Sequence, residues 1–200
     1  MKVFSESIRI AVILAVTAAS LYWAPQANAS PMADIERLMP QRTIVSHYEG
    51  QDLGGLVVNA RGKLTFFYID DRLADALRRR QREERDRGEL SEIPRQVFGY
   101  ATKSKRGHVI FIARVQALKG WTFDPSMLSV GGFSPAGEDI ITGISSNPIF
   151  ELEFAERALP VGYDGFIGFF VPVGNAPRGE AINLGYASDL VDWQVPDRNQ

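Results

Sequence analysis

Short runs of β-branched and aromatic residues recur along this chain from residue 44 to residue 195, and turns containing glycine or proline separate them. Recurring runs of this kind are typical of all-β domains. One highly charged segment, residues 71–88, interrupts the series. A single helical segment among many strands is an insertion, and it argues against the alternating strands and helices of a parallel α/β sheet. The sequence therefore predicts an all-β fold, either an antiparallel β-sandwich or a β-barrel, with one charged helical insertion.

Two runs have the pattern of central strands. In 108–118, Val109 and Phe111 alternate with Ile110 and Ile112, so both faces of the strand are apolar. The run 166–171 is the most apolar one beyond the N-terminal segment. We also expect a tight hairpin in which Asn59–Gly62 joins 56–58 to 64–69, with positive φ at Gly62. A second hairpin is expected between a strand at Gln96–Lys103 and 108–118, with the basic tip Ser104–Gly107.

The charged segment 71–88 carries the one basic cluster that is a candidate partner-binding site. Asp70 or Asp71 can cap this helix, and Leu73 and Leu77 lie one turn apart on one face. The cluster consists of Arg78, Arg79, Arg80 and Arg82. Guanidinium groups bind carboxylates and phosphates, so a protein or an envelope polymer is a candidate partner. Interleaved Asp and Glu residues also fit the alternative of a merely solvated helix.

The first 29 residues have the organisation of a secretory signal. Lys2 and Arg9 precede an apolar run that ends at Pro25, and Ala27-Asn28-Ala29 places small residues where signal peptidase cleaves. The predicted domains are a signal peptide at 1–29, a poorly structured lead-in at 30–43, and a β-sandwich at 44–196. We expect export to the periplasm or the medium, and an uncleaved, membrane-anchoring signal is the alternative.

Composition excludes several classes of function. The chain has no cysteine, which excludes thiol catalysis, thiolate metal sites, disulfides and a lipoprotein anchor. Its net charge of −2 does not fit a nucleic-acid-binding domain. The two histidines, His47 and His108, lack the spacing of a metal site. We therefore expect no metal and no cofactor.

No catalytic motif is evident, and we expect a protein that is not an enzyme. A Gly-x-Ser-x-Gly elbow is absent, and Glu151 and Glu153 alternate with apolar residues as on a solvated strand face. Six aromatic residues could form an exposed binding patch, and the alternative is that they are buried in the hydrophobic core. They are Tyr68, Tyr100, Trp121, Tyr163, Tyr186 and Trp193.

From about residue 96 to 195 the chain resembles the bacterial telokin-like immunoglobulin-fold extracellular domains. The likeness lies in the Asp-Pro bend of 121–130, in Leu159-Pro160-Val161-Gly162 followed by 166–172, and in 182–186 as the penultimate strand. Tyr163 departs from the family, where an acidic residue often follows the turn. The resemblance implies an immunoglobulin-like sandwich and a non-catalytic role.

We therefore predict an exported, non-catalytic binding module of the envelope or the extracellular space. Two alternatives stay open. One is a hydrolase of cell-wall polymers or polysaccharides, which needs histidines or carboxylates to converge in a cleft. The other is a structural component of an envelope assembly, in which the apolar run 166–171 would be partly exposed.

Overall fold

The computed structural model describes residues 30–87, 95–144 and 151–197. The predicted signal segment, residues 1–29, lies outside the described residues. The described elements belong to the compact unit Pro31–Gln200. They are mostly strands in antiparallel sheets with few helices, as the sequence predicts.

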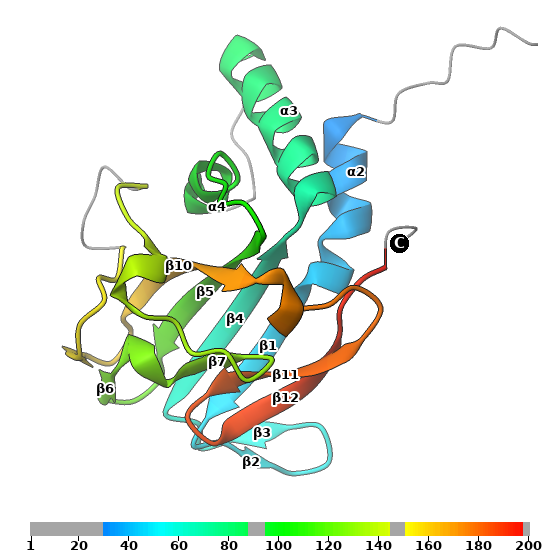
Figure 1. Ribbon diagram of the computed structural model, residues 1–200. Coiled ribbons are helices and arrows are strands. Elements are labelled where there is room, and N and C mark those ends of the chain that lie inside the picture. Colours follow the sequence, from blue (N-terminus) through cyan, green and yellow to red (C-terminus); the bar gives the residue numbers. More distant parts are fainter. Residues whose placement is uncertain (1–29, 88–94, 145–150, 198–200) are drawn as a thin grey trace, which may run out of the picture. The chain divides into compact units, whose positions relative to one another are not determined.

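The largest sheet has five strands in the order β1-β4-β5-β10-β8, all antiparallel (Figure 1). Their bounds are β1 Thr43–Tyr48, β4 Gly62–Ile69, β5 His108–Ala117, β8 Ile140–Ile141 and β10 Asp164–Pro172. A three-stranded sheet has the order β12-β11-β7, with β7 Leu128–Val130, β11 Ala181–Tyr186 and β12 Asp189–Gln194. Two short pairs join β2 Gln51–Asp52 to β3 Val57–Val58, and β6 Trp121–Phe123 to β9 Arg157–Leu159.

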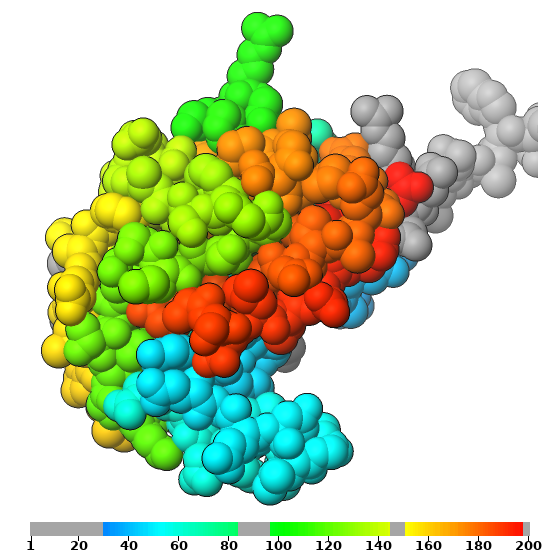
Figure 2. Space-filling view, turned by 60° about the horizontal axis from the view of Figure 1, so that its bottom comes forward, coloured from blue at the N-terminus to red at the C-terminus, as the bar shows by residue number. Residues whose placement is uncertain are grey.

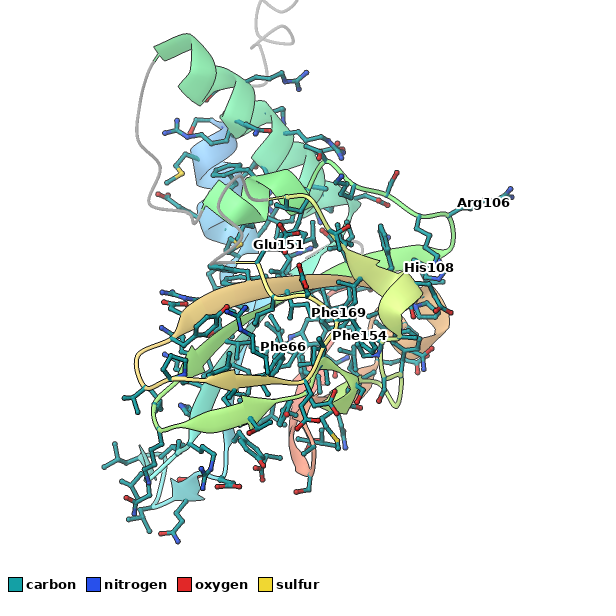
Figure 3. All side chains as sticks on the ribbon, turned by 90° about the vertical axis from the view of Figure 1, so that its left-hand side faces the viewer. Phe66, Arg106, His108, Glu151, Phe154 and Phe169 are labelled. Atoms are coloured by element: carbon teal, nitrogen blue, oxygen red, sulfur yellow. The ribbon has the colours of Figure 1, made fainter. Side chains whose placement is uncertain are left out.

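The helices and 3₁₀ turns are few. The α-helices are α2 Pro31–Leu38, α3 Asp71–Arg87 and α4 Arg95–Tyr100. The 3₁₀ turns are η1 Pro40–Arg42, η2 Pro125–Met127, η3 Gly137–Asp139 and η4 Val173–Asn175. In Figure 3 the helices lie on one side of the large sheet, whereas Phe66 and Phe169 lie on the other.

The large sheet is buried on both faces. On one face Phe66, Phe111 and Phe169 pack against the small sheet. On the other face Ile110 and Ile112 pack against the helices. This arrangement confirms β5 and β10 as central strands, since a strand covered on both faces must be apolar on both. Each large side chain buried in this way stabilises the fold by about 1.5–3 kcal/mol.

The predicted helix 71–88 is confirmed as α3, and its first turns contact the sheet. Leu73, Ala76 and Leu77 are fully buried between α3 and the sheet. Asp70 caps the helix, because its Oδ1 accepts a hydrogen bond from the Leu73 backbone N–H at 2.9 Å.

The predicted strand Gln96–Lys103 is wrong, because 95–100 is helix α4. Val97, Phe98, Tyr100 and Ala101 are buried. Buried residues at positions i, i+1, i+3 and i+4 follow a helical period and not the alternation of a strand. The basic segment Ser104–Gly107 is therefore a helix-to-strand loop and not a hairpin tip.

The hairpin predicted at Asn59–Gly62 is also wrong. Residues 57–58 pair with β2, while β4 pairs with β1 and β5. The tight turn lies at Gly54 and Gly55, which have φ of 69° and 92°. Gly62 is the first residue of β4, where a Cβ would meet the Trp121 ring at 2.3 Å. A close approach of an aromatic ring, not a turn, requires this glycine.

The predicted lead-in 30–43 differs from the structure, which has helix α2 and the turn η1 in this region. Ile35 and Leu38 are buried against α3 and the sheet, and Arg42 has no exposed surface. Local composition did not reveal this helix, because only tertiary contact buries its short apolar face.

Phe169 and Phe170 differ in burial, and their substitution should differ in cost. Phe169 is fully buried between the sheets, whereas Phe170 is half-buried on the helix side. We expect Phe169→Ala to lower the free energy of unfolding by about 3–5 kcal/mol, and Phe170→Ala to lower it clearly less. Urea denaturation followed by circular dichroism measures both. Equal losses would contradict this placement of β10.

Gly168 should resist substitution because α4 rests on it. A Cβ at Gly168 would lie 2.2 Å from the Tyr100 ring. We expect Gly168→Ala to lower the free energy of unfolding by about 1–3 kcal/mol. Gly120→Ala is the matched control, since nothing lies within 4 Å of its Cβ position. Urea midpoints that shift equally for the two variants would disprove the contact between Tyr100 and β10.

Candidate functional site

The structure does not gather the four candidate arginines into one open patch. Arg79 donates to the Asp34 carboxylate of α2 at 2.8 Å, and this hydrogen bond is the main reason that the pKa of Asp34 is lowered. Arg78 donates to the Ala101 carbonyl at 2.9 Å and to Asp75. Arg80 lies 3.8 Å from Glu83, and Arg82 is exposed. Arg78 and Arg79 thus bind α3 to its neighbours.

Arg78 also lines the main candidate site, a cavity of about 630 Å³ that we call the basic cleft. Three segments form it: the end of β4 with the start of α3, the loop 101–107 with the start of β5, and residues 173–178 after β10. In Figure 2 the green loop 101–107 projects beside the orange segment 173–178. The cleft is lined by Tyr68, Ile69, Asp70, Asp71, Ala74, Arg78, Lys103, Ser104, Lys105, Arg106, Gly107, His108, Val109, Ile110, Val173, Ala176 and Arg178.

Positive charge dominates the basic cleft although the whole chain has a net charge of −2. Its basic side chains are Arg78, Lys103, Lys105, Arg106 and Arg178, against the acidic Asp70 and Asp71. Lys103 and Arg106 are exposed, and neither pairs with a carboxylate in the described part of the chain. Figure 3 shows Arg106 projecting from its loop. Such a concentration of like charge attracts anions.

The two acidic residues of the cleft are placed differently. Asp71 has a side chain 97% exposed and lies 3.6 Å from Arg178, so this ion pair is weak. Asp70 is buried, and its Oδ2 accepts a hydrogen bond from the Arg42 guanidinium at 2.8 Å. Arg42 also donates to the Leu38 carbonyl at 3.2 Å. Arg42 of η1, which does not line the cleft, therefore balances the charge of Asp70, and the net charge of the cleft lining stays positive.

Lys105 is partly held by the fold. Its Nζ lies 3.1 Å from the Asp139 carboxylate and 5.7 Å from the centre of the Phe170 ring. These contacts fix one end of loop 101–107 against the large sheet. Lys103 and Arg106 flank this fixed point on the same loop.

The hydroxyl of Tyr68 is buried at the lining of the cleft beside Arg178, whose guanidinium can only donate to it, so no described residue accepts the proton of this hydroxyl. Its side chain has no exposed surface. Burial raises the pKa of Tyr68, the Asp70 carboxylate raises it further, and Arg178 opposes the rise. The hydroxyl is therefore protonated at neutral pH, and its proton is available to an acceptor.

The histidines and carboxylates of the described residues do not converge. His47 lies beside Lys63, which pairs with Gln116, so His47 is eight residues along the sheet from His108. At about 3.4 Å per residue this offset is roughly 27 Å. Within residues 30–87, 95–144 and 151–197, no group of three or more His, Asp or Glu side chains could hold a metal ion.

The candidate aromatic patch serves mainly as core. Tyr68, Tyr100, Trp121 and Tyr186 are buried, and Trp121 packs between Tyr48 and Tyr186 with ring centres about 5 Å apart. Trp193 donates its indole N–H to the Gln41 carbonyl at 3.1 Å. In the run 166–171 every residue is buried except Phe170, which is half-buried.

Comparisons with protein-family models, with curated proteins and with solved structures found no match to this chain. Every helix in the described ranges is too short or too polar to span a bilayer.

Sequence reasoning missed most of the basic cleft. The sequence shows the basic run Lys103-Ser104-Lys105-Arg106, but its local pattern predicts a hairpin tip and not the wall of a cleft. Arg178 and Tyr68 lie far from this run in sequence and carry no motif. Only the fold brings the three segments together.

The Arg42–Asp70 pair should be essential for the wall of the cleft, because both side chains are buried. We expect Arg42→Met to lower the free energy of unfolding by about 3–5 kcal/mol, since it leaves a buried carboxylate unpaired. The double variant Arg42→Met/Asp70→Asn should recover part of that loss, and Asn still caps α3. A double-mutant cycle by urea denaturation measures the coupling. Additive losses would show that the two residues do not interact.

Proposed function

We propose that this chain is an exported, non-catalytic binding module that holds an anionic ligand in the basic cleft. The cleft itself carries the proposal. Its volume of about 630 Å³ is in the range of small-molecule sites, and exposed basic residues line it together with a buried hydroxyl whose proton no described residue accepts. Charge-assisted hydrogen bonds from such groups are the strong ones.

We further propose that the β-layers form an immunoglobulin-like sandwich related to the telokin-like extracellular domains. Two packed antiparallel sheets support this relationship. So do the local structures at the three similar segments: η2 bends the chain between β6 and β7 at Asp124-Pro125, Gly162 has φ of 82° before β10, and β11 is the penultimate strand. The helices on the far face of the large sheet are an addition to that sandwich.

Anion binding is tested by nuclear magnetic resonance titration of the full chain with inorganic phosphate at constant pH and ionic strength. We expect saturable shifts at the backbone amides of 103–109 and 173–178. Lys103→Gln/Arg106→Gln should weaken phosphate binding roughly tenfold, since each charged hydrogen bond contributes about 1.5–3 kcal/mol before screening.

The control is Lys119→Gln/Arg157→Gln, which removes the same charge from exposed residues outside the cleft. It should leave the titration unchanged. Equal weakening by both double variants would mean that only net charge matters. Absence of any saturable shift would disprove an anion site in the cleft.

A further inference from the structure

The basic cleft has apolar walls as well as basic residues. Ile69 and Ala74 lie on the side of β4 and α3, Val109 and Ile110 at the start of β5, and Val173 and Ala176 after β10. Val173 is 49% exposed, which places a large apolar side chain in water at the cleft. A hydrated inorganic ion makes no favourable contact with such a wall.

The anion-binding groups lie at different depths. Tyr68 is fully buried, whereas Arg178, which lines the same cleft, has a side chain that is 35% exposed. Lys103 and Arg106 are exposed on the projecting loop. A ligand head group at Tyr68 and Arg178 would therefore place the rest of the ligand along the apolar wall.

We infer that the ligand is a small amphiphilic anion, with one anionic head group and an aliphatic or aromatic body. The head group accepts a hydrogen bond from the Tyr68 hydroxyl and forms an ion pair with Arg178. The body of the ligand contacts Val109, Ile110 and Val173. This inference rests on the proposed function and adds the class of ligand to it. A volume of about 630 Å³ accommodates a medium-chain fatty carboxylate.

Isothermal titration calorimetry of the full chain with acetate, octanoate, decanoate and inorganic phosphate tests the inference. We expect one decanoate per chain and an affinity that rises with chain length, by about fourfold for each methylene that becomes buried. Decanoate should thus bind roughly fifteenfold more tightly than octanoate when both additional methylenes become buried, and acetate and phosphate should bind most weakly.

Two variants locate the head group and the body. Val173→Asn removes the exposed apolar wall without adding charge, and should weaken decanoate binding severalfold while acetate binding stays the same. Val161→Asn is the matched control, because Val161 is 70% exposed and lies outside the cleft. Tyr68→Phe removes only the hydroxyl, and should weaken decanoate and phosphate alike, by about tenfold.

The outcomes separate this inference from the proposed function. If phosphate and acetate bind as tightly as decanoate, the cleft binds anions without any contribution from an apolar body, and the inference of an amphiphilic ligand is wrong. If no anion binds, both proposals fail. Decanoate binding that neither Val173→Asn nor Tyr68→Phe alters would place the ligand elsewhere and overturn the inference. Co-sedimentation with phosphatidylglycerol vesicles without decanoate binding would overturn it in favour of a membrane surface.

Discussion

Burial of the large sheet on both faces is the constraint on which the rest of the structure depends. Strands β4, β5 and β10 present apolar side chains on each side, so neither face can be left to water. The small sheet covers one face, and α2, α3 and α4 cover the other. Because the chain has no disulfide, this packing must supply nearly all of the stability.

The basic cleft lies where the helical layer meets an end of the large sheet. β4 ends at Ile69, Asp70 caps α3, and β5 begins at His108, so loops rather than regular structure line this end. Loops that a rigid scaffold holds in place are common carriers of binding sites. The buried Arg42–Asp70 pair fixes one wall, and the Lys105–Asp139 pair holds the opposite loop.

Two of the four candidate arginines hold helix α3 against its neighbours. Its arginines look like a surface for a partner, but Arg79 binds α2 and Arg78 binds the end of α4. The guanidinium group of arginine hydrogen-bonds carboxylates and carbonyls of its own chain as readily as the same groups of a partner. Of the candidate cluster, Arg78 is the residue that also lines the cleft.

The sequence by itself determined the β-rich class, the central strands expected at 108–118 and 166–171, and the charged helix expected at 71–88, which correspond to β5, β10 and α3. Local alternation and capping signals carry that information. The tertiary structure alone decided that residues 95–100 are helical, that Gly62 makes room for Trp121, and that Tyr68, Lys103 and Arg178 line one cleft. The space for Trp121 and the cleft arise from contacts between residues distant in the chain, which no local pattern of a single sequence encodes. Helix 95–100 has only six residues, so its short apolar period was not enough to distinguish it from a strand.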